Sequence, residues 1–76
     1  MGMKIQDLSD IGSIIRQQRK AAGLSIETLA SMLACSPRLL GELERGARNV
    51  SFIIVLKTCA MLGIELFAKC RGDHKP

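Results

Sequence analysis

The sequence predicts a mainly α-helical domain of four helices, followed by one short C-terminal β-strand that pairs across a dimer. Four segments carry apolar residues at helical spacing, and capping residues and glycines separate them. Residues 64–70 instead alternate apolar and polar side chains, which is the pattern of a strand. The chain of 76 residues has room for one domain, and its 47% of apolar residues favours self-association.

The first helix is predicted over residues 10–22, after a lead-in of residues 1–9. We expect Ser9 or Asp10 to cap its start, because both side chains accept hydrogen bonds from backbone N–H groups. Gly23 follows where a left-handed residue commonly ends a helix. The predicted buried stripe consists of Ile11, Ile14, Ile15, Gln18 and Ala22.

Two shorter helices are predicted next, the first over residues 25–33 with Ser25 as its N-cap. The second has Ser36 as N-cap and Pro37 at the first helical position, an order that marks a helix start, and Gly46 ends it. The residues expected to point inward are Leu29, Ala30, Met32 and Leu33 in one helix and Leu39, Leu40 and Leu43 in the other. Those expected to face outward are Arg38, Gly41, Glu42 and Arg45.

The fourth helix is predicted from Ser51 to Gly63, and it is apolar almost all round, which indicates burial on more than one side. The strand over residues 64–70 has no partner strand in the chain. Since a lone strand leaves its edges unpaired, we expect it to pair with the same strand of a second copy. The expected dimer contacts are Ile64, Leu66, Phe67 and Ala68, and residues 71–76 form a polar tail.

Composition favours a duplex-DNA partner. The net charge is +4 and the pI is about 9.4, which suits a polyanion. Phe52 and Phe67 are the two aromatic residues, whereas readers of single strands stack bases on many aromatic rings. The alternative interpretation of the net positive charge is that the basic side chains are simply solvated. No run of apolar residues is long enough to span a bilayer.

The chemistry of a metal site or an enzyme is not expected. The three cysteines and the single histidine match no zinc-binding spacing, and no nucleophile triad or paired carboxylates are evident. An odd number of cysteines without a secretory signal predicts a cytoplasmic protein with unpaired thiols and no cofactor. The residues concerned are Cys35, Cys59, Cys70 and His74.

Two capped helices joined by a turn of three to four residues make a helix-turn-helix motif. The major groove of B-DNA admits one helix, whose N-terminal residues then contact base edges. Ser25 and Ser36 each cap a helix start, where a phosphate can approach backbone N–H groups. Simple helix packing is the alternative interpretation of the same motif.

The segment LSIETLASMLACSPRLLGELERG resembles the Cro/C1-type (XRE) helix-turn-helix family, over about residues 11–68. Within that family the chain is most similar to HipB-type antitoxins, because the segment IELFAKC follows the last helix directly. The resemblance implies a homodimeric repressor of a near-palindromic operator, partnered by a HipA-like kinase toxin. The matching positions are Arg19, Gly23, Leu24, Ser25, Leu29, Ala30, Ser36, the run 42–46 and Gly63.

The family roles carried over by the resemblance assign base contacts to the third helix. Arg38 is the candidate for bidentate reading of guanine, and Glu42 for accepting from cytosine. Gly41 is small enough for close approach to DNA. The implied phosphate contacts are Arg45, Arg48 and Asn49, with Ser25, Ser36 and Pro37 also in the implied interface.

Arg19 and Glu44 occupy positions that the family uses as a structural ion pair between the first and third helices, and Arg19 is a further candidate phosphate contact. The chain departs from the family at Ile26, which replaces a phosphate-binding glutamine, at Ala34, which replaces a left-handed glycine, and at Pro37, which replaces a polar base-reader. These departures leave open a stand-alone repressor, or an interaction module that has lost DNA binding.

Overall fold

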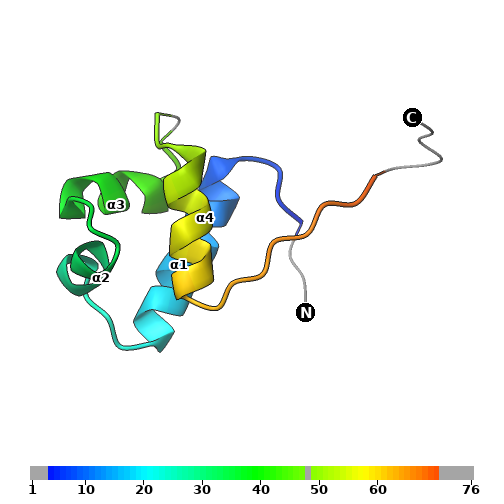
Figure 1. Cartoon of the computed structure of the whole chain (residues 1–76). Coiled ribbons are helices and arrows are strands. Elements are labelled where there is room, and N and C mark those ends of the chain that lie inside the picture. The colour runs from blue at the N-terminus through cyan, green and yellow to red at the C-terminus, as the bar shows by residue number, and fades with distance from the viewer. Residues whose placement is uncertain (1–3, 48, 71–76) are drawn as a thin grey trace.

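Four helices make up the folded body of the chain, and the computed structural model describes residues 4–47 and 49–70 (Figure 1). Helix α3 packs against both α1 and α2, so the predicted mainly α-helical fold is confirmed. Within the described residues, no helix has the length and apolar character needed to cross a membrane. The helices are α1 (Leu8–Ala21), α2 (Ile26–Met32), α3 (Pro37–Glu44) and α4 (Phe52–Met61).

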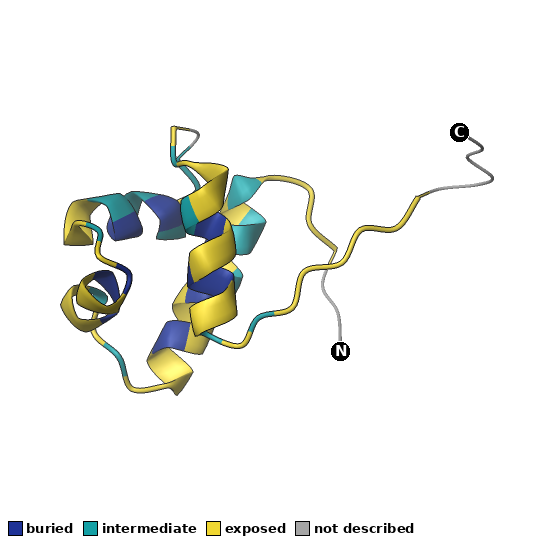
Figure 2. Ribbon diagram, viewed as in Figure 1, coloured by how far each residue is buried: buried dark blue, intermediate teal, exposed yellow. Residues whose placement is uncertain are grey.

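All four helices contribute side chains to one core, which appears as the dark blue inner surfaces in Figure 2. Burying each large apolar side chain stabilises the fold by about 1.5–3 kcal/mol. Three residues expected in buried stripes are exposed instead: Gln18, Ala22 and Met32. The buried residues of α1 are Gly12, Ile15 and Arg19, and those of α2 are Leu29 and Ala30, so the buried faces are narrower than the predicted stripes. The core residues are Ile15, Leu29, Ala30, Leu33, Leu40, Leu43, Val55 and Cys59.

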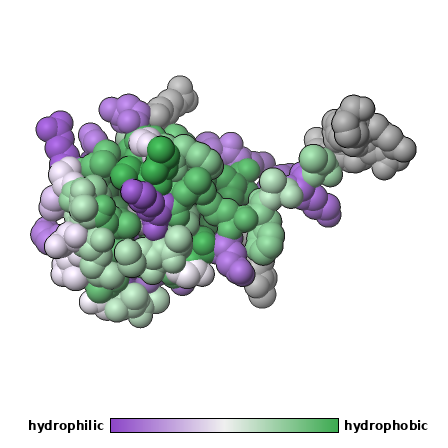
Figure 3. All heavy atoms as spheres, in the orientation of Figure 1, coloured by the Kyte–Doolittle hydropathy of each residue, from purple (hydrophilic) through white to green (hydrophobic). Residues whose placement is uncertain are grey.

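Helix α4 buries one side and exposes another, although its sequence is apolar almost all round. Val55, Thr58 and Cys59 are buried. The polar Thr58 is satisfied because its hydroxyl donates to the Ile54 carbonyl at 2.7 Å. Apolar surface covers much of this helix in Figure 3. Its large exposed residues are Phe52, Ile53, Leu56 and Met61. Burial of α4 on more than one side therefore requires contact with a second molecule, and it stays a prediction.

Residues 64–70 run away from the helices as an extended segment (Figure 1) and form no ladder in the single chain, within the part that is described. Ile64 packs on the core, whereas Leu66 and Phe67 are exposed. A strand needs a partner edge for its backbone groups. Pairing across a dimer thus stays a prediction.

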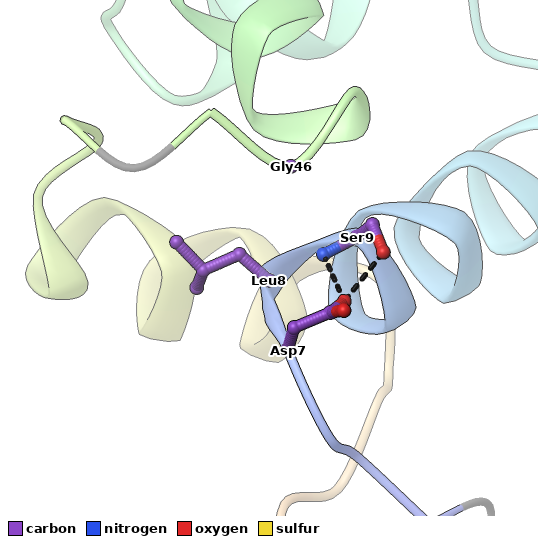
Figure 4. A pocket seen from close by; sticks show the side chains of 4 residues that line it. All are labelled: Asp7, Leu8, Ser9 and Gly46. Carbon is purple, nitrogen blue, oxygen red and sulfur yellow. Dashed lines mark hydrogen bonds between the residues drawn. The ribbon is translucent and has the colours of Figure 1, made fainter.

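Helix α1 begins two residues earlier than predicted, and its N-cap is Asp7 rather than Ser9 or Asp10. The Asp7 carboxylate accepts from the backbone N–H of Ser9 at 2.9 Å and of Asp10 at 3.3 Å. The Asp10 carboxylate in turn accepts from the N–H of Asp7, which completes a capping box. Figure 4 shows this helix start beneath Gly46, where a Cβ atom would lie only 2.7 Å from the Ser9 Cα.

Helix α2 ends on an alanine in the left-handed region, at Ala34 with φ of 55°. The Cys35 N–H donates to the Ala30 carbonyl at 3.0 Å, and the Ala34 N–H to the Ser31 carbonyl at 3.2 Å, which is a Schellman motif. Helix α1 ends with the same pair of bonds around Gly23, whose φ is 72°. Ala34 therefore adopts the left-handed conformation that the family gives to glycine, and this conformation costs an alanine about 1–2 kcal/mol.

Replacing Ala34 with glycine is expected to raise the free energy of unfolding by about 1 kcal/mol, because the relief of strain exceeds the added freedom of the unfolded chain. Urea denaturation measures the change. The matched control is Gly23→Ala, where a Cβ meets nothing within 4 Å, so that its expected loss of about 1 kcal/mol is purely conformational. A neutral or destabilising Ala34→Gly would show that the left-handed alanine costs nothing.

Candidate nucleic-acid interface

The starts of α2 and α3 are fixed by serine caps, as predicted. Ser25 Oγ accepts from the Thr28 N–H at 3.0 Å, and Ser36 Oγ accepts from the Leu39 N–H at 3.0 Å. Pro37 occupies the first turn of α3, where its missing N–H leaves no unpaired donor. Both serines are exposed, so a phosphate can reach the positive end of either helix.

Arg19 of α1 and Glu44 of α3 form the predicted ion pair. Arg19 Nε lies 2.7 Å from Glu44 Oε2, and Nη2 lies 3.2 Å from Oε1. The side chains are only 10% and 6% exposed. Arg19 Nη1 also donates to the Leu24 carbonyl at 2.8 Å. The hydrogen bond that Arg19 donates to the Glu44 carboxylate raises the pKa of Arg19, although burial opposes it, so the guanidinium stays charged.

All three nitrogen atoms of the Arg19 guanidinium have protein partners. Its geometry supports the structural role, and its phosphate contact stays a prediction. A second link between α1 and α3 is Gly12, which sequence reasoning missed. A Cβ there would lie 2.5 Å from the carbonyl oxygens of Leu43 and Glu44. A glycine inside a helical pattern is the signal that indicates such a close approach.

Arg38 projects from the first turn of α3 into solvent, with its side chain 88% exposed. Its Nε lies 4.0 Å from Glu42 Oε2 one turn along. Such an exposed i,i+4 pair contributes only about 0.2–0.5 kcal/mol, so the guanidinium is available to another partner. Glu42 is half-buried rather than fully outward. The two side chains share one face of α3.

Gly41 does not face outward, and this prediction was wrong. It is buried, and the guanidinium of Arg45 lies over it, with Nη1 3.3 Å from the place of a Cβ atom. Helix α3 is buried over a wide arc because α1 and α2 both pack on it. Close approach of DNA to Gly41 is therefore blocked by the Arg45 side chain in this structure.

The phosphate contacts implied beyond α3 are placed only in part. Arg45 caps the C-terminus of α3 and is exposed, and Asn49 is exposed in the following loop. Arg48 lies outside the described residues. The interface residues thus divide into a group at the start of α3, around Ser36 and Arg38, and a group at its end.

The cysteines behave as unpaired thiols. Cys35 is half-buried, Cys59 is buried and Cys70 is exposed. Burial raises the pKa of the Cys59 thiol, which keeps it protonated at neutral pH. No group of three or more potential metal ligands occurs among residues 4–47 and 49–70, and His74 lies outside them.

The comparison with protein families decides the classification of this fold. The helix-turn-helix family model matches residues 15–68. The chain belongs to the helix-turn-helix family. It is 33% identical over 55 residues to the HTH-type transcriptional regulator RamB of Mycobacterium tuberculosis, a match that covers 72% of this chain and 12% of RamB. The chain therefore spans about an eighth of that relative's length.

Two solved structures share the fold. The restriction-modification controller protein C.AhdI from Aeromonas hydrophila is 43% identical with a TM-score of 0.67, over 76% of this chain and 88% of that one. A chain of the HipA-HipB-O2-O3 complex has a TM-score of 0.81 over 93% of this chain and 100% of that one, at 14% identity. These matches confirm the predicted Cro/C1-type (XRE) helix-turn-helix domain.

Proposed function

We propose that the protein binds duplex DNA as a two-fold homodimer and regulates transcription, with the first turn of α3 in the major groove. The observation that carries this proposal is the exposed start of α3. It presents Arg38, 88% exposed, on a helix that the Arg19–Glu44 pair fixes to α1. The similarity to RamB, which is a transcriptional regulator, supports the same function.

The proposed contacts divide into base contacts and phosphate contacts. Arg38 reads guanine O6 and N7 with its guanidinium, and Glu42 accepts from cytosine N4 on the same face. Ser25 and Ser36, with the helix starts that they cap, receive backbone phosphates. Arg45, Arg48 and Asn49 meet phosphates beyond the end of α3. Pro37 leaves few polar atoms for base contact, so DNA shape contributes to specificity.

The homodimer is supported by apolar surface that a single chain leaves uncovered. Phe52 and Ile53 of α4 are 63% and 64% exposed, and Phe67 in the extended segment is 88% exposed. Antiparallel pairing of residues 64–68 with those of a second copy pairs their backbone groups and covers Leu66 and Ala68. Two-fold symmetry then places the two copies of α3 in successive major grooves, about 34–36 Å apart, which is one turn of the DNA helix. The matching operator is near-palindromic.

The regulatory circuit has two candidates. One is the antitoxin of a HipA/HipB-like pair that represses its own operon, with a kinase toxin as partner. Its support is the TM-score of 0.81 to a chain of the HipA-HipB-O2-O3 complex. The other is a restriction-modification controller, which the 43% identity to C.AhdI favours. The adjoining reading frames distinguish them, since a kinase-like gene supports the first and a nuclease or methyltransferase gene the second.

Substituting Arg38 by alanine is expected to weaken specific binding by about 1–3 kcal/mol and to relax the preference at one base pair. Arg48→Ala should instead weaken binding to all duplexes alike and reduce the salt slope by about 1. Fluorescence anisotropy over a range of salt concentrations measures both. Equal behaviour of the two variants would exclude base reading by Arg38. Absence of any duplex binding by the wild-type protein would indicate an interaction module instead.

Leu66→Asp is expected to yield a folded monomer with greatly weakened operator binding, because a charge cannot be covered in the middle of the paired segment. Leu66 lies outside the helices and is 42% exposed, so circular dichroism should show unchanged helix content. Lys69→Asp, on the other face of the same segment, is the matched control and should remain a dimer. Sedimentation that finds a tight Leu66→Asp dimer would exclude this segment as the association surface.

A further inference from the structure

The extended segment after α4 has one apolar face and one face with a charge near each end. Ile64 packs against the core, and the apolar face continues along the segment because side chains alternate in an extended chain. The opposite face carries Glu65, Phe67 and Lys69. Glu65 and Lys69 are exposed (Figure 2), and neither forms an ion pair within residues 4–47 and 49–70. Both charges are therefore available to a second molecule.

Two-fold symmetry allows this segment only a few registers with a second copy. Residues directly opposite each other in an antiparallel pair point to the same face of the sheet. The two-fold axis of such a pair is perpendicular to the sheet, so that each face keeps its own side. A residue can therefore lie opposite only a residue of its own face, and one residue at the centre lies opposite its own copy. The register is defined by the residue on the axis.

Charge and chain geometry disfavour three of the central residues. With Glu65 or Lys69 on the axis, like charges lie directly opposite each other, which is destabilising. With Leu66 on the axis, Lys69 lies opposite Gly63 of the second copy. Gly63 has a φ of 72° in the turn that ends α4, so the strand does not extend to it.

Ala68 on the axis also leaves the segment poorly matched. Phe67 then lies opposite Lys69, and the apolar Ile64 lies opposite a residue beyond 70, where the alternation of the sequence has ended. Neither of these is a favourable cross-strand pair.

Phe67 on the axis matches every position of the segment. Each Glu65 then lies opposite Lys69 of the other copy, and the two Phe67 side chains meet at the centre. Opposite-charge and aromatic pairs of this kind stabilise antiparallel strands. The pairing runs from residue 64 to residue 70, and its apolar pairs are Leu66 with Ala68 and Ile64 with Cys70.

We propose that the segment pairs with Phe67 on the two-fold axis, and that Glu65 and Lys69 select a second copy of this chain as the partner. The inference rests on the homodimer of the proposed function. A strand of another chain with the same fold, but with different charges at these positions, leaves a charge unmatched or opposed. Exposed pairs contribute little each, so Lys69→Asp stays a dimer and dissociates more readily.

A charge exchange in the full-length protein tests the selection of the partner. Glu65→Lys and Lys69→Glu should each raise the dimer Kd by about three- to thirtyfold, and the double variant should return it to within about twofold of wild type. Sedimentation measures the Kd, and Lys20→Glu in α1 is the matched control for net charge. In a mixture of wild type and the double variant, labelled chains should form fewer mixed dimers than random pairing gives. Failure of the double variant to recover would overturn the selection.

Cysteine cross-linking tests the register independently. Leu66→Cys, Phe67→Cys and Ala68→Cys are compared in a Cys70→Ser background, which retains the half-buried Cys35 and the buried Cys59. Residue 67 should form the disulfide fastest under mild oxidation, because the Cβ atoms of opposite residues lie about 4.5–5.5 Å apart. Diagonal neighbours lie about 7–8 Å apart, which is too far for a disulfide.

The outcomes separate the register from the dimer itself. Fastest cross-linking at residue 66 or 68 would overturn the register, and a wild-type dimer in which none of the three positions cross-links would overturn the paired segment. A wild-type protein that sediments as a monomer would instead overturn the homodimer of the proposed function.

Discussion

The buried ion pair between Arg19 and Glu44 is the interaction on which the arrangement of the helices depends. It joins residues 25 positions apart in the chain, and the same guanidinium also holds the Leu24 carbonyl at the entry to α2. One side chain therefore fastens α1, the α1–α2 turn and α3. Taking two charges out of water is costly, so the value of this pair lies in fixing one geometry rather than in large net stability.

The position of α3 follows from this link and from close packing beside it. Gly12 lets the α1 backbone reach the last carbonyl groups of α3, and Gly46 lets the chain turn against the start of α1. The C-terminal half of α3 is thereby held, and its N-terminal turn projects with Ser36 and Arg38 exposed. A rigid support and an exposed first turn are what direct reading of base edges needs.

Local chemistry made part of this structure predictable. The serine caps and the Ser36-Pro37 start follow from backbone hydrogen bonding within a few residues, whereas the left-handed position of Ala34 came from the family resemblance. The sequence predicts a later start for helix α1 because Asp10, which serves the capping box from its third position, is itself a favourable N-cap residue. The true cap, Asp7, lies outside the apolar stripe that marked the helix.

Tertiary contacts were harder to foresee. Gly41 was expected to face outward, because spacing alone does not show that α3 is covered on two sides or that Arg45 lies back over it. The pairing of Arg19 with Glu44 came from family resemblance, since nothing local joins residues so far apart. The alternation in residues 64–70 indicates a strand, but its partner lies outside a single chain.

A double-mutant cycle on Arg19 and Glu44 tests the central claim most directly. Arg19→Met and Glu44→Gln should each cost about 3 kcal/mol, because each leaves a buried group without its partner. The Ala34→Gly background offsets about 1 kcal/mol of each loss during urea denaturation. The account predicts that the double variant loses less than the sum, with a coupling of at least about 1 kcal/mol, while the exposed Arg38–Glu42 pair shows a coupling near zero. Additive losses at Arg19 and Glu44 would contradict it.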